Sequence, residues 1–202
     1  MSVSDRLFEN ALVYKLWQRP FVEQKIAPLV RCGVIANARR VLDVGCGPGT
    51  NTTSFDRSEY LGLDINPEYV EYARRQFRRE FLVADLTLST LPQIGEFDFV
   101  LVNSLLHHLD SGAVRGLLRN LSMLLSSDGH VHVLDMVLPD RRWSIPWVLA
   151  RLDRGDFARP LPELRALVAE AFEIEQFKRY PLSAGGIKLW DFVYFKGRSR
   201  RV

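Results

Sequence analysis

Residues 41–50, VLDVGCGPGT, place an apolar run, one carboxylate and three glycines next to one another. Glycine permits positive φ angles and lets the main chain lie directly against a ligand. A strand that runs into such a loop is where an open α/β sheet binds a nucleotide-like molecule. A dinucleotide fingerprint needs a glycine at position 50, where this chain has Thr50, and the Gly-Lys-Ser/Thr ending of a P-loop is absent. The stretch therefore predicts a nucleoside-type ligand and argues against a dinucleotide.

Polar residues stand at the predicted ends of three further strands. Asp64 and Asp85 each close a short apolar segment, and Asn103 closes a longer one that runs into the turn 104–108. An acid about 20 residues beyond a glycine loop can accept hydrogen bonds from both hydroxyls of a ribose, which gives Asp64 a role. Since ligands bind at the carboxyl ends of parallel strands, we expect these residues to share one site.

The order D-x-G-x-G-x-G at residues 43–49 resembles the first motif of the class I, Rossmann-like methyltransferases that use S-adenosylmethionine. The segment 103–109, NSLLHHL, resembles the fourth motif of their small-molecule branch. The resemblance implies S-adenosyl-L-methionine as cofactor, S-adenosyl-L-homocysteine as product, a small-molecule acceptor and no metal. In this family the acid after the third strand takes the exocyclic amine of adenine. The cofactor-binding residues implied are Asp43, Gly45, Cys46, Gly47, Gly49, Asp64, Ile65, Asp85, Leu86 and Asn103.

Methyl transfer from a sulfonium is an in-line displacement whose leaving group departs as a neutral thioether. The protein must align the reacting atoms and exclude water, and a base is needed only where the acceptor must lose a proton. His107 and His108 are the candidates for that catalytic base, and a positioned histidine contributes about 10²–10⁴-fold. Neighbouring side chains in a helical turn cannot both face the pocket, so we expect His107 to face it and His108 to be structural. A structural role for both histidines is the alternative.

The segment 140–160 follows the predicted fifth strand at the ligand end of the sheet, and substrate identity should reside there. In one interpretation Trp143 and Trp147 form an aromatic wall and arginines bind an anionic group of the substrate. In a second, the aromatics close the core and the arginines pair with acids in solvent. In a third, this face lies on a membrane and collects a lipid-linked acceptor. The arginines concerned are Arg141, Arg151, Arg154 and Arg159.

The spacing of apolar residues predicts the elements that position these groups. Helices are expected in 5–30, split at Pro20 and ended by Gly33, where Tyr14 and Trp17 either cover the substrate or pack in the core. Five βα alternations and a final strand pair predict a doubly wound, mostly parallel seven-stranded sheet with an antiparallel last strand and helices on both faces. Strands are expected at 40–44, 60–64, 81–84, 97–103, 130–136, 173–179 and 188–196, and further helices at 68–79, 111–127 and 162–171.

The 202 residues fit a single domain, 1–202, with 1–33 as an N-terminal helical cap and 140–160 as a lid or substrate insertion. Two cysteines give no disulfide framework and fit a reducing cytosol. No apolar run is long enough to span a bilayer, and the first residues do not read as a secretory signal. We therefore expect a cytoplasmic protein, either a monomer or a homodimer.

The formal net charge of +3 is too mild to indicate a nucleic-acid partner. In the family, amino-methylation of DNA bases uses an N/D-P-P-Y/F turn, and the N-S-L-L turn at 103–106 lacks its prolines and its aromatic residue. The expected reaction is methyl transfer to a small molecule, at oxygen before nitrogen or carbon. Alternatives that stay open are a protein or RNA methyltransferase and a non-catalytic S-adenosylmethionine-binding protein.

Overall fold

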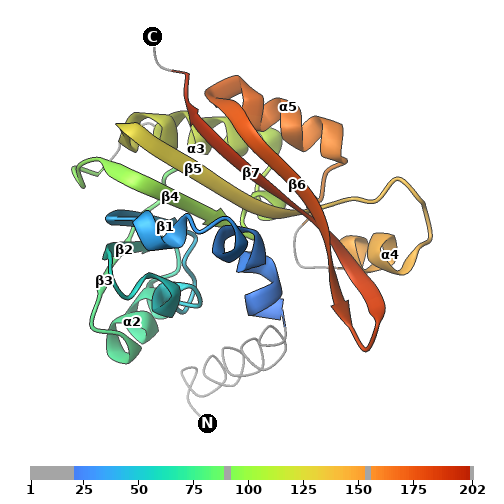
Figure 1. The fold of residues 1–202 in the computed structure, drawn as a ribbon, viewed down its shortest axis with the longest axis horizontal. Helices are drawn as coiled ribbons and strands as arrows, with labels where there is room; N and C mark the ends of the chain where they lie inside the picture. Colours follow the sequence, from blue (N-terminus) through green and yellow to red (C-terminus); the bar gives the residue numbers. More distant parts are fainter. Residues whose placement is uncertain (1–20, 89–91, 153–155, 201–202) are drawn as a thin grey trace.

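The computed structural model describes residues 21–88, 92–152 and 156–200, and Figure 1 shows their arrangement. Residues 21–31 are helical. The strands are β1 (Arg40–Val44), β2 (Glu59–Asp64), β3 (Glu80–Val83), β4 (Phe97–Asn103), β5 (Leu125–Val137), β6 (Phe172–Ala184) and β7 (Ile187–Ser199). The α-helices that follow are α2 (Pro67–Gln76), α3 (Ser111–Leu124), α4 (Ile145–Leu152) and α5 (Leu161–Ala171). Short 3-10 helices are η1 (Ile35–Asn37), η2 (Thr52–Phe55) and η3 (Leu106–His108). The predicted split at Pro20 lies outside the described residues.

The seven strands form one sheet in the order β3-β2-β1-β4-β5-β7-β6. The ladders among β1 to β5 are parallel, whereas β7 runs antiparallel to both of its neighbours, β5 and β6. The chain winds outward in one direction through β1, β2 and β3 and in the other through β4 and β5. Because ligands bind where the winding reverses, the loop after β1 and the turn after β4 come together at the binding edge. The predicted fold class is confirmed.

Helices cover both faces of the sheet, as the alternation of side chains along β1 shows. Val41 belongs to a buried cluster with Leu29 of the first helix and Val70 of α2. Leu42 faces the other way and belongs to a cluster with Leu117 of α3, to which α5 also contributes. Figure 1 shows α3 and α5 along one face of the sheet and α2 on the other. Burial on both faces explains why the central strands are almost continuously apolar.

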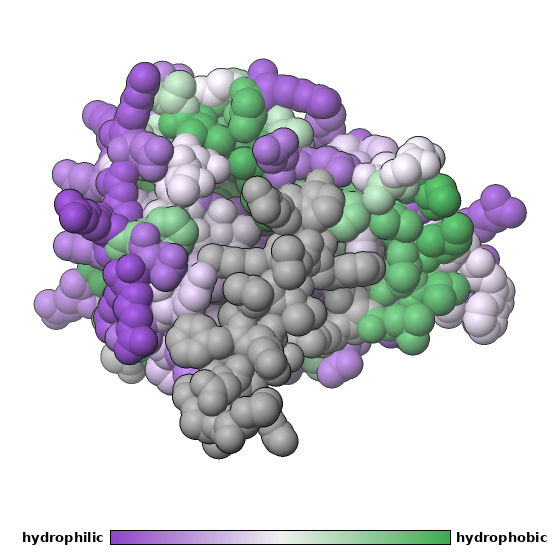
Figure 2. Space-filling view, turned by 90° about the horizontal axis from the view of Figure 1, so that it is seen from below, coloured by the Kyte–Doolittle hydropathy of each residue, from purple (hydrophilic) through white to green (hydrophobic). Residues whose placement is uncertain are grey.

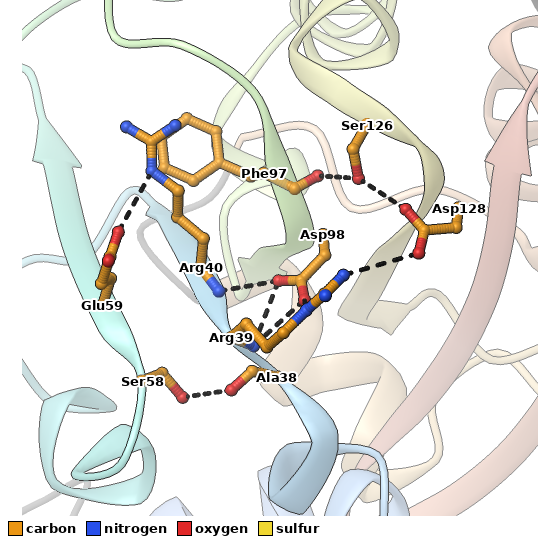
Figure 3. A network of polar contacts seen from close by, with 9 residues as sticks. All are labelled: Ala38, Arg39, Arg40, Ser58, Glu59, Phe97, Asp98, Ser126 and Asp128. Carbon is orange, nitrogen blue, oxygen red and sulfur yellow. Dashed lines mark hydrogen bonds and ion pairs between the residues drawn. The ribbon is translucent and has the colours of Figure 1, made fainter.

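Asp98 ties the amino ends of β1 and β4 together (Figure 3). Its carboxylate accepts hydrogen bonds from the backbone N–H of Arg40 at 2.8 Å and of Arg39 at 3.1 Å, and from Arg39 Nε at 3.1 Å. Asp98 is the second residue of β4. It lies at the end of the sheet opposite the glycine loop, so its contribution is to fix the two central strands.

The boundary between α3 and β5 differs from the predicted one. The helix ends at Leu124, and Leu125 pairs with Phe97 of β4 ahead of an irregularity in the ladder. Gly129 then passes so close to β4 that a Cβ would lie 2.7 Å from the Phe97 carbonyl oxygen. The predicted end of the helix at residue 127 is therefore wrong, because pairing with β4 takes these residues into the sheet.

The hairpin that closes the sheet is longer than predicted. Pro181 pairs with Asp191 within the β6–β7 ladder, and the turn consists of Gly185 and Gly186, both with positive φ. The predicted strands 173–179 and 188–196 are therefore too short at this end. Proline is tolerated here because β6 is the edge strand of the sheet.

Candidate active site

The loop after β1 depends on its three glycines. Gly45, Gly47 and Gly49 have φ angles of +70°, +54° and +80°, where other side chains are strained. A Cβ on Gly49 would lie 2.6 Å from the ring of Phe77, and one on Gly45 would lie 3.0 Å from the side chain of Leu105. The loop can therefore hold this shape, close to its neighbours, only with glycine.

Cys46 packs inside this loop. Its N–H donates to the Leu63 carbonyl at 2.9 Å, beside the N–H of Gly45 at 2.8 Å, which anchors the loop to the end of β2. Burial raises the pKa of the Cys46 thiol well above its ordinary value. The buried thiol is a packing group.

Asp64, the last residue of β2, is held by backbone donors on both oxygens. Its Oδ2 accepts from the Gly47 N–H at 2.8 Å, and its Oδ1 accepts from the Asn66 N–H at 2.9 Å. Each carboxylate oxygen offers two acceptor positions, so each can take one further donor. The half-buried side chain stands beside the exposed Ile65. This arrangement fits the two adjacent hydroxyls of a ribose.

Asp43 is fully buried, with protein partners on its carboxylate. It accepts from the Tyr60 hydroxyl at 2.6 Å and from Asn51 Nδ2 at 3.2 Å. Burial raises the pKa of Asp43 to about 6, although the hydrogen bonds from Tyr60 and Asn51 lower it. Asn51 Oδ1 accepts in turn from Asn103 Nδ2 at 3.0 Å. Asn51 and Asn103 line a cavity on the glycine loop, so Asp43 is connected to that cavity through these two side chains.

The buried carboxyl of Asp43 makes stability depend on pH. Its pKa is about 6 in the fold, above the ordinary 3.8, so its contribution is present below pH 3.8 and is lost as the pH rises through 6. The amide in Asp43→Asn cannot ionise. We therefore expect the difference in unfolding free energy, variant minus native, to be more positive at neutral pH than at acid pH by roughly 3 kcal/mol. Urea denaturation across pH measures it, with the exposed Asp56→Asn as control. A difference that does not vary with pH would contradict the assignment.

The corner after β3 is closed by local bonds. Asp85 Oδ1 accepts from the N–H of Thr87 at 2.8 Å and from its hydroxyl at 2.6 Å. The side chain of Leu86 is buried, and its carbonyl accepts from Asn120 Nδ2 of α3 at 2.8 Å. Leu86 can therefore meet a ligand only through its backbone.

The turn after β4 places the two histidines in different environments. His107 is only 4% exposed, whereas His108 is exposed. His107 Nδ1 lies 2.5 Å from Asp135 Oδ1, and Asp135 also accepts from the N–H groups of Leu106 at 2.6 Å and Met136 at 2.7 Å. Burial alone would raise the pKa of Asp135, but the charge and hydrogen bond of His107 and the two backbone bonds hold that pKa below its ordinary value. The ionised Asp135 favours the tautomer of His107 that carries its hydrogen on Nδ1 and its basic lone pair on Nε2.

Arg159 clamps this turn from the segment 140–160. Its buried guanidinium donates to the carbonyls of Leu106 at 2.8 Å, Leu109 at 2.5 Å and Phe157 at 3.1 Å. The N–H of Phe157 donates to the His107 carbonyl at 3.0 Å. The interpretation of Arg159 as an anion-binding residue is wrong, because its donors are spent on backbone carbonyls.

Removing this clamp should destabilise the turn that carries His107. Arg159→Met keeps the aliphatic stem but leaves buried carbonyls without donors, so we expect the free energy of unfolding to fall by roughly 2–5 kcal/mol. Arg165→Met, at an exposed position of α5, should change it by less than about 0.5 kcal/mol. Chemical denaturation of the two variants tests this. An equal loss of unfolding free energy in both would show that the hydrogen bonds of Arg159 do not stabilise the turn.

A cavity of about 60 Å³ lies on the glycine loop. The first helix contributes Val22 and Lys25 to its wall. Pockets for drug-sized ligands measure about 300–1,000 Å³, so binding a nucleoside requires these covering side chains to move. The remaining lining residues are Gly45, Cys46, Gly47, Pro48, Thr50, Asn51, Asn103 and Ser104.

The predicted substrate residues are only partly brought together. Trp143 and Trp147 have ring centroids 5.2 Å apart, and the guanidinium of Arg151 lies 5.6 Å from the Trp147 ring. Trp143 is 76% exposed, so the two indoles do not form a closed aromatic wall. Tyr14, Trp17 and Arg154 lie outside the described residues.

The sequence analysis did not single out three residues that the structure places at the site, Asn51, Tyr60 and Asp135, and it gave Arg159 a different role. The rule that selects polar residues at the carboxyl ends of strands would have found Asp135, which stands near the end of β5 as Asn103 ends β4. No pattern marks Asn51 or Tyr60, because they come together at their shared partner Asp43, which is distant from Tyr60 in the sequence.

Comparisons with known proteins agree with this geometry. Residues 41–129 match the family described as "Methyltransferase domain". The malonyl-[acyl-carrier protein] O-methyltransferase of Legionella pneumophila is 28% identical over 98 residues, which are 45% of this chain and 34% of that protein. The ribosomal protein L11 methyltransferase of Dechloromonas aromatica is 36% identical over 74 residues, which are 35% of this chain and 25% of that protein. The chain thus spans about a quarter to a third of these relatives.

The fold is shared with a solved structure, the N-methyltransferase NodS from Bradyrhizobium japonicum. It superposes with a TM-score of 0.67 at 16% identity, over 90% of this chain and 98% of that one. The shared fold, the glycine loop and the matched segment lead to one assignment: residues 41–129 carry a methyltransferase domain, in a chain with the class I, Rossmann-like methyltransferase fold.

Proposed function

We propose that the protein transfers the methyl group of S-adenosylmethionine to an oxygen of a small-molecule acceptor and releases S-adenosylhomocysteine. The observation that carries the choice of acceptor atom is the buried pair of His107 Nδ1 and Asp135 Oδ1, 2.5 Å apart at the binding edge of the sheet. A hydroxyl must lose its proton on methylation, and an oriented imidazole provides the base. One of the relatives is by name an O-methyltransferase.

The cofactor, when bound, supplies an electrophilic methyl group on a sulfonium that leaves as a neutral thioether. Asp64 would hold the ribose hydroxyls, and the corner at Asp85 and Leu86 would hold the adenine. His107 Nε2 takes the proton of the acceptor hydroxyl, so that the oxygen lone pair forms the new bond to carbon. Asp135 is a positioning residue, because it fixes the imidazole and stabilises its protonated form.

A protein or RNA acceptor would favour a broad basic groove at this same edge. The large groove of about 1030 Å³ lies instead at the amino ends of the strands. Its arginines Arg40, Arg74 and Arg79 donate to backbone carbonyls of neighbouring loops and strands. These guanidinium groups are committed to the fold, which favours the small-molecule acceptor.

Transfer of a tritiated methyl group to a panel of phenols, carboxylic acids and amines tests the proposal. We expect label in a hydroxyl or carboxyl acceptor and none in the matched amine. Label confined to amines would overturn the choice of oxygen. Tight cofactor binding with no transfer to any member of the panel or to carrier-bound acids would instead favour the non-catalytic alternative.

A further inference from the structure

Apolar side chains gather on one exposed face, formed by α4, the bend before it and the tip of the β6–β7 hairpin. Trp143 and Leu152 are each 76% exposed, Ile145 is 53% exposed and Ile187 is 54% exposed. We call these four residues the α4 patch. Figure 2 shows hydrophobic side chains collected at the side of the molecule where Figure 1 places α4 and the hairpin. A monomeric protein does not normally expose such large side chains next to one another without a use for them.

The exposure of Trp143 is built into the backbone. Its φ is +62°, a left-handed value that is an outlier for a bulky residue. Ser144 fixes the bend, because its hydroxyl donates to the Arg141 carbonyl at 2.8 Å and accepts from the Trp147 N–H at 3.4 Å. A strained bend that points an indole outward favours a functional use of that indole.

The α4 patch is accompanied by unpaired positive charge. Arg141, Arg142 and Arg151 are exposed, and none of them has an ion pair with a carboxylate among residues 21–88, 92–152 and 156–200. The guanidinium groups of Arg142 and Arg151 lie over the Trp147 ring, at 6.0 Å and 5.6 Å from its centroid.

The acids on this face are balanced by other cations. Asp191 pairs with Lys188 at 2.5 Å and with Arg179 at 3.2 Å. Arg179 also lies 3.8 Å from the exposed Asp140. The three arginines beside the α4 patch are therefore not paired with these two acids, and an anionic partner can bind them.

We propose that the α4 patch docks the protein onto an anionic lipid bilayer. An amphipathic segment that combines tryptophan and large aliphatic side chains with arginines is typical of a helix that lies in a bilayer interface. The arginines favour anionic lipid, since each basic residue near such a surface strengthens binding about fivefold. A cleft of about 830 Å³ beside the patch is lined by Arg141, Arg142 and Lys188 and also by Asp140 and Asp191, so the two arginines are its cations without a carboxylate partner among the described residues. Docking does not depend on the proposed methyl transfer, since it needs neither cofactor nor acceptor.

Co-sedimentation of the full chain with sucrose-loaded vesicles tests the proposal. We expect the protein to pellet with phosphatidylcholine mixed with phosphatidylglycerol, to be released by salt, and to stay in solution with phosphatidylcholine alone. Ile145→Glu combined with Leu152→Glu should weaken binding by about tenfold or more, and Arg151→Gln by about fivefold. Met123→Glu on α3, another exposed apolar position, and Arg165→Gln on α5 are the matched controls.

Trp143 provides a second readout. Brominated anionic lipids should quench the tryptophan emission of the native protein more than that of Trp143→Phe. Equal pelleting with both vesicle types, no pelleting with either, or an equal loss in Met123→Glu would overturn the proposal. Capture of an acidic carrier protein by the α4 patch, without vesicle binding, would replace the lipid surface with a protein partner.

Discussion

We expect His107→Ala to lower kcat for a hydroxyl acceptor by about 10²–10⁴-fold, the contribution typical of a positioned base. Affinity for S-adenosylmethionine should be unchanged, because His107 is not among the residues assigned to the cofactor. His108→Ala is the matched control, since the neighbouring imidazole is exposed and is not the one paired with Asp135. Initial rates at saturating cofactor and acceptor measure the effect.

Asp135→Asn separates a base from a purely structural histidine. An asparagine can present an amide donor to His107 Nδ1, which favours the tautomer with its lone pair on the wrong nitrogen. We expect a loss of kcat comparable to that of His107→Ala, with recovery of His107→Ala by added imidazole. Native rates in both variants, with the fold retained by circular dichroism, would remove the base from the mechanism.

The second large effect concerns Asp64. In Asp64→Ala the two ribose hydroxyls lose a charged acceptor, and each such hydrogen bond is worth about 1.5–3 kcal/mol. We expect the Kd for S-adenosylmethionine to rise by about 10²-fold or more. Asp64→Asn keeps one acceptor oxygen, so its affinity should fall between those of the native protein and Asp64→Ala.

Asp64→Ala should also affect the glycine loop, because the Gly47 N–H donates to the Asp64 carboxylate at 2.8 Å. Loss of that support loosens the glycine loop in Asp64→Ala. Titration calorimetry with S-adenosylmethionine and with S-adenosylhomocysteine measures both ligands, with Asp56→Asn as a surface control. Unchanged affinity for both ligands in Asp64→Ala would show that the ribose is held elsewhere.

Much of the fold could be predicted from local rules. The bounds of β1, the glycine loop and the end of the first helix at Gly33 follow from apolar runs and from positive φ. Asn66 caps α2 through a bond from the Glu68 N–H at 2.9 Å, with Pro67 in the first turn, a pattern of neighbouring residues that is typical of a helix start. Each of these features depends on residues a few positions apart.

The rest depends on partners that are distant in sequence. Leu125 joins the sheet only because Phe97 of β4 lies beside it. The pairing of His107 with Asp135 joins the ends of two neighbouring strands, and the bonds of Arg159 go to carbonyls, which every residue carries. No side-chain pattern could reveal such bonds, whereas strand ends alone predicted the location of the site.

The most direct test of the central claim is titration calorimetry of the unmodified protein with S-adenosylmethionine and with NAD. Thr50 at the third position of a dinucleotide fingerprint, the positive φ angles of Gly45, Gly47 and Gly49, and Asp64 held beside the loop all favour the methyl donor. We expect saturable one-site binding of S-adenosylmethionine and no heat from NAD. Tight binding of NAD without binding of S-adenosylmethionine would contradict the assignment.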